Sequence, residues 1–204
     1  MLEKLPYLLM LFPIITLHEY AHAWMAHRCG DDTAKDQGRM NLNPISHIDL
    51  FGSVILPIIN VSFGGTPLGF GKTVPVDRYQ FQHPRRDDIL VALAGPVANF
   101  LLAFIVLLLA TVALPAGHEL LILAEKFAQF AVFLGFFNLL PFPPMDGWTL
   151  CKTIFKLPDS LEQRIGPWWI LIILVCINLP PLQFALNLST HLVLSLIRGL
   201  LSLF

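Results

Sequence analysis

The sequence predicts an all-α polytopic membrane protein with about five to six transmembrane helices and a short re-entrant glycine-rich/β segment between the first two long spans. Two observations predict this class. Hydrophobic residues make up 55% of the 204 residues and charged residues only 13%, a composition too apolar for a soluble domain of this size. Residues 89–114 also contain no charged side chain, and this run is long enough to cross a hydrocarbon core of about 30 Å.

Charge and cysteine content narrow the class of function. The formal net charge is −1, and the chain has no block of lysine and arginine, so nucleic acid is excluded as a partner. The three cysteines are widely spaced and form no C-x-x-C pair; they are Cys29, Cys151 and Cys176. This pattern indicates ordinary thiols, and neither a disulfide framework nor a cysteine zinc site.

The first half of the chain contains one clear span and one doubtful one. Residues 5–26 are apolar apart from a short polar motif, and a polar loop follows over 28–46. Residues 48–63 include a glycine and a central proline and have too few apolar residues for a confident span, so we expect a re-entrant segment over about 48–76. Its end predicts a short extended piece at a sheet edge, Lys72-Thr73-Val74-Pro75-Val76. A plain surface loop explains the preceding glycines equally well.

The clearest span, residues 89–114, carries two features that an ordinary lipid-facing helix lacks. The dipeptide Gly95-Pro96 predicts a kink and a close approach of another helix. Asn99 is a polar group that needs a partner in lipid, and such residues more often join helices than take part in catalysis.

The remaining chain completes the expected domain organisation. A further span covers about 120–140, a charged cytosolic loop covers 151–164, and two apolar runs over 165–204 form a C-terminal transmembrane hairpin. Residues 1–150 are the expected catalytic core.

The distribution of positive charge favours the re-entrant path for residues 48–63. If this piece crosses the membrane, the arginines and lysines divide between the two sides, whereas a re-entrant piece leaves most of them on one side, as the positive-inside rule requires. The polar motif near the end of the first span then lies toward the cytosolic side of the cell membrane. The first span and the 120–140 span also run in the same direction, so the end of the first span and the residues just after the second lie at the same depth.

The polar motif in the first span is His18-Glu19-Tyr20-Ala21-His22. On a helix the two histidines lie one turn apart on one face, so both rings can reach one zinc ion. Glu19 is rotated by about 100°, which suits a general base that must reach a water without binding the metal. Such a motif can occur by chance in soluble proteins, but ionisable residues inside a membrane span are costly and indicate function.

Catalytic zinc sites usually have three protein ligands, so the histidine pair needs a third. Asp146 is the best candidate, because it follows a proline run that ends a helix and lies at the expected depth. By itself Asp146 would be interpreted as a turn aspartate, and the histidine pair reverses that judgement.

Several motifs together resemble the site-2 protease family of intramembrane zinc metalloproteases. They occur in the family's order between about residues 15 and 150 and comprise His18-Glu19-Tyr20-Ala21-His22, Asn41-Leu42-Asn43-Pro44, Gly71-Lys72-Thr73-Val74-Pro75-Val76, Ala94-Gly95-Pro96-Val97-Ala98-Asn99 and Asn138-Leu139-Leu140-Pro141-Phe142-Pro143-Pro144-Met145-Asp146-Gly147. The resemblance implies one Zn²⁺ per chain held by His18, His22 and Asp146, with Glu19 as the catalytic base. It also implies that Asn138 and Asn99 hold the substrate or the developing oxyanion, and that residues 63–76 offer a strand edge to the substrate.

The activity that this resemblance implies is hydrolysis of peptide bonds within or near transmembrane segments of membrane-protein substrates in the lipid bilayer. A transmembrane helix hides its peptide bonds, so it must unwind locally, and pairing with a strand edge would satisfy the freed backbone groups. The sequence lacks the PDZ domain of some members and the CBS domains of others, so we expect a minimal catalytic core and a separate partner that recruits the substrate.

Two interpretations from other classes stay open. The chain could be a catalytically silent relative that binds transmembrane helices or metal. It could also be another membrane zinc peptidase, acting on prenylated or soluble peptides, for which a glutamate third ligand on a later helix would be typical.

Overall fold

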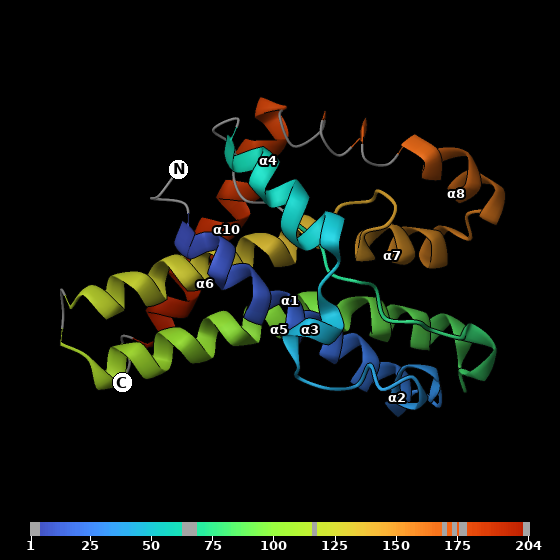
Figure 1. Ribbon diagram of the computed structural model, residues 1–204, viewed down its shortest axis with the longest axis horizontal. Helices are drawn as coiled ribbons and strands as arrows, with labels where there is room; N and C mark the ends of the chain where they lie inside the picture. The colour runs from blue at the N-terminus through green and yellow to red at the C-terminus, as the bar shows by residue number, and fades with distance from the viewer. Residues whose placement is uncertain are drawn as a thin grey trace. The chain divides into compact units, whose positions relative to one another are not determined.

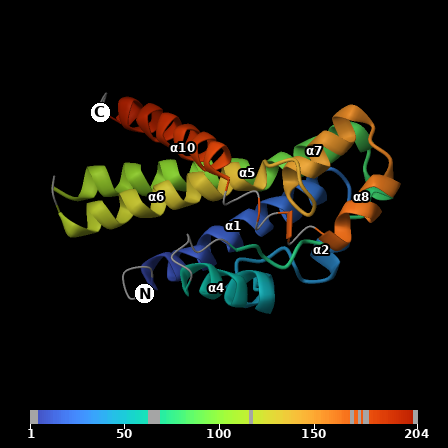
Figure 2. The same cartoon turned by 90° about the horizontal axis from the view of Figure 1, so that it is seen from above.

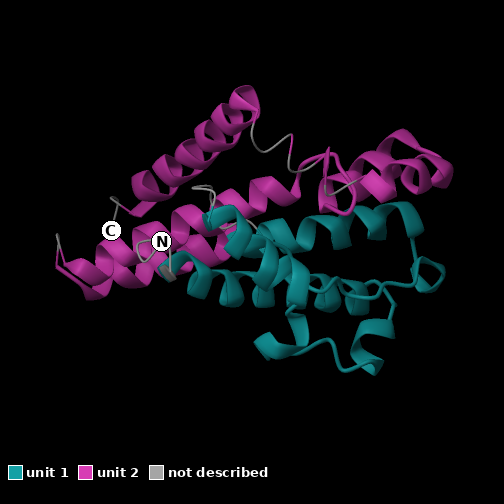
Figure 3. Ribbon diagram, turned by 45° about the horizontal axis from the view of Figure 1, so that its top comes forward, with its two compact units in different colours: residues 1–99 teal, residues 100–204 magenta. Residues whose placement is uncertain are grey.

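The computed structural model describes residues 5–62, 69–115, 118–168, 171–172, 175 and 179–201. Every regular element among these residues is a helix, as predicted (Figures 1 and 2). The chain divides into two compact units, residues 1–99 and residues 100–204, and the boundary falls inside the long helix α5, Pro84–Ala113 (Figure 3). The two units are described in turn.

The first unit is organised around α1, Leu5–Arg28, which carries the polar motif, and the first part of α5. Two short helices contact α1, namely α2, Thr33–Asp36, and α3, Pro44–His47. The helix α1 ends at Arg28, and the chain turns at Gly30, whose φ of +103° is a conformation that favours glycine. There the Asp31 N–H donates to the Ala26 carbonyl at 3.0 Å, the 6→1 bond of a glycine-terminated helix.

A small apolar cluster joins the end of α1 to the start of α5. Its buried members are Ala26, Cys29, Phe81 and Val91. Burial, followed by the nearby Asp87 carboxylate, raises the pKa of the Cys29 thiol. This environment belongs to an ordinary buried thiol, and Cys151 is also free, whereas Cys176 lies outside the described residues.

Asp31 ties together two distant parts of the first unit. Its carboxylate is fully buried and accepts the N–H of Thr33 at 2.9 Å and the N–H of Asp77 at 2.8 Å. The polar loop after α1 is therefore fixed to the chain just before α5. The stretch between Asp31 and Asp77, called the excursion below, is closed at its two ends by this carboxylate.

That excursion contains the apolar helix Leu50–Ser62, which consists of a π-helix, Leu50–Ile55, and α4, Leu56–Ser62. The Asp49 side chain caps it by accepting the Gly52 N–H at 2.7 Å. A rise of 1.5 Å per residue makes this helix about 20 Å long, shorter than the roughly 30 Å of a hydrocarbon core. The helix is too short for a straight crossing, and a re-entrant path stays a prediction.

Residues 69–77, called the extended segment below, return from this helix without forming a strand, and no strand occurs in any part of the chain that the structure describes. The predicted β piece pairs with no strand among the described residues, and the N–H groups along one of its edges bond to other partners. Phe70 donates to the Gly52 carbonyl at 3.1 Å and Lys72 to the His47 carbonyl at 2.9 Å, and Pro75 has no N–H to contribute to a ladder. Most of the glycine-rich stretch before it, residues 64–68, lies outside the described residues.

The second unit consists of the rest of α5 with α6, Glu119–Asn138, α7, Asp146–Phe155, α8, Asp159–Ile165, and α10, Pro180–Leu201. The end of α5 and α6 run side by side (Figures 1 and 2), and α10 contacts α6. A Cβ at Gly135 would lie 2.6 Å from Cε1 of Phe100, so α5 and α6 approach closely there. Residues 151–164, expected as a charged loop, are mostly helical, because Lys152 of α7 pairs with Asp159 and Glu162 of α8 at 2.6 and 2.5 Å.

Three of the described helices are long and apolar enough to cross a membrane, namely α5, α6 and α10. The helix α1 has 24 residues, but its histidines and glutamate make it less apolar than these three. In the expected span over 165–182, residues 169–170, 173–174 and 176–178 lie outside the described residues, and the total of five to six spans stays a prediction.

Candidate metal centre

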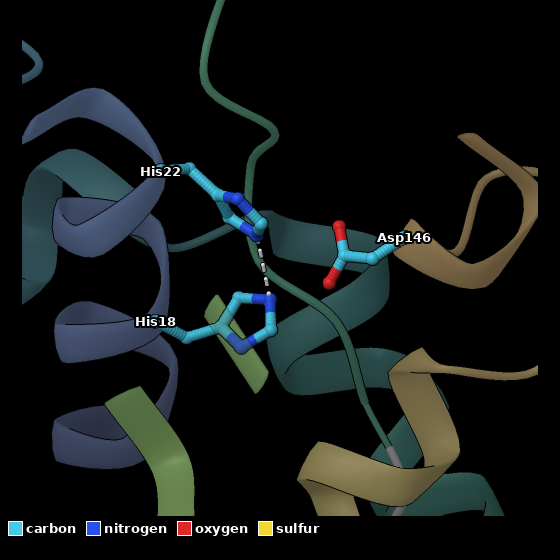
Figure 4. A group of neighbouring side chains, drawn as sticks. All are labelled: His18, His22 and Asp146. Carbon is cyan, nitrogen blue, oxygen red and sulfur yellow. Dashed lines mark hydrogen bonds between the residues drawn. The ribbon is translucent and has the colours of Figure 1, made fainter. Parts of the chain in front are cut away.

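His18 and His22 project from one face of α1, and both side chains are buried. Their Nε2 atoms lie 3.0 Å apart, and the ring centroids are 4.6 Å apart with the planes at 78° (Figure 4). Two nitrogens bound to one tetrahedral zinc at about 2.0–2.1 Å would be roughly 3.3 Å apart. The observed pair is therefore close to the spacing that a shared metal ion requires, and the two residues fit zinc.

The orientation of His22 is set by the backbone of α5. Its Nδ1 lies 2.7 Å from the Val91 carbonyl oxygen, and since a carbonyl can only accept, Nδ1 must carry the proton. The other ring nitrogen, Nε2, is then unprotonated, which is the form in which a neutral imidazole binds a metal. A carbonyl partner of this kind is the usual way in which a metal-binding histidine is held in one tautomer.

The backbone of α5 passes next to the Nε2 atoms of both histidines at Gly95. A Cβ built on this glycine would lie 2.6 Å from His18 Nε2 and closer still to His22 Nε2. The site therefore has α1 on one side and bare backbone of α5 on another.

Glu19 is buried on the same helix but turns toward the extended segment. The Val74 N–H donates to Glu19 Oε2 at 3.2 Å, and a Cβ at Gly71 would lie 2.9 Å from Oε1. The carboxylate is thus held by the backbone of the extended segment, and the two histidines contact α5 instead. Glu19 and the two histidines therefore contact different parts of the first unit.

Asn99 lies one turn beyond Gly95 on α5, so the two residues share a helix face. Its side chain is 1% exposed, and within the described residues its Oδ1 has no hydrogen-bond partner. A buried acceptor left unpaired costs about 1–3 kcal/mol. The sequence interpretation of Asn99 as a residue that joins helices leaves this oxygen unexplained.

Asp146 and Asn138 belong to the second unit. Asp146 is the first residue of α7 and is partly buried. Asn138 is the last residue of α6, and its amide nitrogen donates to the Leu134 carbonyl at 2.9 Å. Their participation in the site is considered under the proposed function.

Three features of the site in the first unit were not predicted from the sequence, namely the Val91 carbonyl, the Val74 N–H and the contact of Gly95 with the histidines. The Val91 carbonyl and the Val74 N–H are backbone groups, which every residue type offers, so no residue pattern could single them out. Gly95 was expected to allow a close approach of helices, but its neighbours, the two imidazoles, were not foreseen.

Comparisons with known proteins show that the sequence of this chain is similar to those of peptidases. Residues 6–117 match the model of Peptidase family M50. "Putative zinc metalloprotease YwhC" of Bacillus subtilis (strain 168) is 40% identical over 173 residues, which cover 80% of this chain and 75% of that protein. "Putative zinc metalloprotease Rip2" of Mycolicibacterium smegmatis is 31% identical over 180 residues, covering 83% of this chain and 65% of that protein. No solved structure matches the chain significantly.

Proposed function

Because this chain belongs to peptidase family M50, the site-2 protease family, we propose that it is a zinc metalloendopeptidase that cleaves membrane-protein substrates within or near their transmembrane segments. The observation that carries the proposal is the buried pair of imidazoles on α1, with Nε2 atoms 3.0 Å apart and a buried glutamate next in sequence to one of them. Ionisable groups buried in an apolar helix are costly unless they serve a function.

The proposed ligands of a single Zn²⁺ are His18, His22 and Asp146. The spacing of the histidines and the Val91 carbonyl behind His22 support the first two. For Asp146 the support is chemical, because a carboxylate in the first turn of α7 is stabilised as an anion by the helix dipole, and the anion is the form that binds zinc. Its place directly after the Pro141–Pro144 turn also matches the family's motif order.

Glu19 is the proposed general base. When bound, zinc would make water more acidic and polarise a peptide carbonyl. Glu19 accepts a proton from the attacking water and returns it to the leaving amine, so that one carboxylate serves both transfers. The bond from the Val74 N–H at 3.2 Å fixes the Oε2 atom of this carboxylate.

The extended segment is the proposed docking edge for an unwound substrate. Alternate N–H groups, those of Phe70, Lys72 and Val74, are bonded within the first unit. In an extended chain the intervening groups of Gly71 and Thr73 point the opposite way, and their N–H groups have no bond among the described residues. A substrate strand would pair with them and satisfy its own freed backbone groups.

Asn99 and Asn138 are the proposed substrate-holding residues. The unpaired, buried Oδ1 of Asn99 could accept a peptide N–H of the substrate, which would remove its desolvation cost. Asn138 donates one N–H of its side-chain amide inside α6, and this amide also has a second N–H and an acceptor oxygen with which to contact the substrate.

The proposed setting is a cell membrane that the chain crosses about five to six times, with residues 48–76 re-entrant and the site toward the cytosolic side. Within it, residues 1–150 form the catalytic core, 151–164 the cytosolic connection and 165–204 the C-terminal hairpin. A separate protein would recruit the substrate.

The test combines zinc content with cleavage of a single-span model substrate in detergent. The native chain should carry one zinc and cut. Glu19→Gln should keep the metal and lose about 10²–10⁴-fold in rate, and Asp146→Asn should weaken metal binding. Matched controls are Glu125→Gln and Asp159→Asn, which alter carboxylates in salt bridges of the second unit.

Two results would count against the proposal. A native chain that binds no zinc, or a Glu19→Gln variant that cuts as well as the native chain, would remove the protease assignment and leave a helix-binding relative as the better description. A Glu125→Gln variant that loses as much activity as Glu19→Gln would remove the specific role of Glu19.

A further inference from the structure

The helix α5 has no side chain at the point where it passes the two histidines. A Cβ on Gly95 would lie 2.6 Å from both Cε1 and Nε2 of His18, and closer still to Nε2 of His22. Real Cβ atoms essentially never approach other heavy atoms to less than 3.0 Å. The two proposed ligand nitrogens therefore occupy the space that any other residue at this position would fill.

The imidazoles cannot easily move aside to make room for a methyl group. His22 is fixed at its far nitrogen by the Val91 carbonyl at 2.7 Å, one turn before Gly95 on the same helix. Its near nitrogen faces His18 at 3.0 Å, and both rings are buried. A shift of either ring would break one of these contacts or change the separation of the two nitrogens.

We propose that Gly95 is a positioning residue of the metal centre, whose missing side chain lets α5 lie close enough to α1 for both Nε2 atoms to bind one ion. This inference rests on the proposed function, because it takes His18 and His22 as metal ligands. Gly95 does not touch the substrate in this account. It sets the distance between the ring pair and the carbonyl that orients one of the rings.

Other glycines of the chain provide the comparison that isolates this role. A Cβ at Gly135 would also be too close to a neighbour, but that neighbour is the Phe100 ring in the second unit, at 2.6 Å. A Cβ at Gly199 of α10 would meet nothing within 4 Å. Among the glycines that the structure describes, Gly95 alone has both Nε2 atoms as its closest neighbours.

The experiment measures Co²⁺ binding by its visible absorption in purified protein that has been stripped of metal. The variants are Gly95→Ala, Gly135→Ala and Gly199→Ala, and each is also followed by thermal unfolding. The native chain and Gly199→Ala should bind one Co²⁺ with equal affinity. Gly135→Ala should lower the melting temperature but bind Co²⁺ normally, and Gly95→Ala should bind about 10–100-fold more weakly.

A second comparison tests the proposal even if the Gly95→Ala chain does not fold. The stability of His18→Ala/His22→Ala is compared with that of the same chain carrying Gly95→Ala as well. If the methyl group collides only with the imidazoles, the two chains should unfold at the same temperature. A triple variant that is much less stable than the double variant would overturn the proposal, because the collision would then lie elsewhere.

The remaining outcomes separate this proposal from the proposed function. Equal Co²⁺ affinity of Gly95→Ala and the native chain overturns the role of Gly95 and leaves the metalloprotease assignment intact. A native chain that binds no Co²⁺ and no Zn²⁺ overturns the proposed function, and the inference falls with it.

Discussion

Two regions of the first unit hold the proposed catalytic residues in different ways. The histidines lie between two helices, where a carbonyl at 2.7 Å fixes His22 and bare backbone at Gly95 lies against both rings. The Glu19 carboxylate instead contacts the extended segment, whose Val74 N–H donates to it at 3.2 Å. Under the proposed function, metal binding therefore depends on α5 and proton transfer on the extended segment. Substitutions in α5 should change metal affinity, and substitutions in the extended segment should change turnover while the metal stays bound.

The strongest test of this separation is Gly71→Ala. The added Cβ would lie 2.6 Å from Ile15 Cγ2 and 2.9 Å from Glu19 Oε1, so the extended segment or the carboxylate must shift. A misplacement of about 1 Å can cost on the order of 10²-fold in rate. We expect kcat to fall by about that factor while zinc content is unchanged. Loss of zinc in this variant, measured by metal analysis beside kcat, would show that the two supports are coupled.

A subtler change is Val74→Pro, which removes the N–H that donates to Glu19 and little else from the backbone. Hydrogen bonds to charged groups contribute about 1.5–3 kcal/mol, so kcat should fall by about 10–100-fold at constant zinc content. The matched control is Val76→Pro, which creates the same pair of adjacent prolines on the other side of Pro75. If both proline variants lose activity equally, stiffening of the segment, and not the lost N–H, is responsible.

The smallest expected effect comes from Arg39→Met. The Arg39 guanidinium donates to the Lys72 carbonyl at 2.6 Å, so it anchors the extended segment two residues before Val74. Loss of one such bond, worth about 0.5–1.5 kcal/mol, should lower kcat/KM by about 2–10-fold. Arg78→Met, which loses the partly buried ion pair with Asp88 at 3.0 Å, is the control and should leave kcat/KM close to native. An unchanged kcat/KM in Arg39→Met would mean that the segment is held without Arg39.

The helical content and the apolar helices could be predicted from the sequence, because hydropathy and charge-free runs report directly on burial in lipid. The extended segment was only half predicted. Its lack of helix follows from Pro75 and the glycines, but the choice of Gly52, His47 and Glu19 as hydrogen-bond partners, in place of a second strand, depends on tertiary structure. The charged residues 151–164 were expected as a loop, since sequence reasoning did not anticipate that Lys152 would join two short helices.

For the site, the spacing of His18 and His22 on one helix face could be predicted because it depends only on helix geometry. The supports of the site could not be predicted. The Val91 carbonyl and the Val74 N–H are invisible in a residue pattern, and the collision that a side chain at Gly95 would cause depends on the packing of α1 against α5.

The buried Asp31 carboxylate closes the excursion between α1 and α5 into a loop. Its bond to the Asp77 N–H joins positions 46 residues apart, and closing a chain of that length costs about 3 kcal/mol of entropy. The hydrogen bond to the Asp77 N–H, at about 1.5–3 kcal/mol, is of the size needed to offset this cost, whereas the bond to Thr33 is local. Val74, whose N–H donates to Glu19, lies inside the closed stretch, three residues before Asp77. Loss of the Asp31 carboxylate would therefore release the end of the extended segment that contacts Glu19.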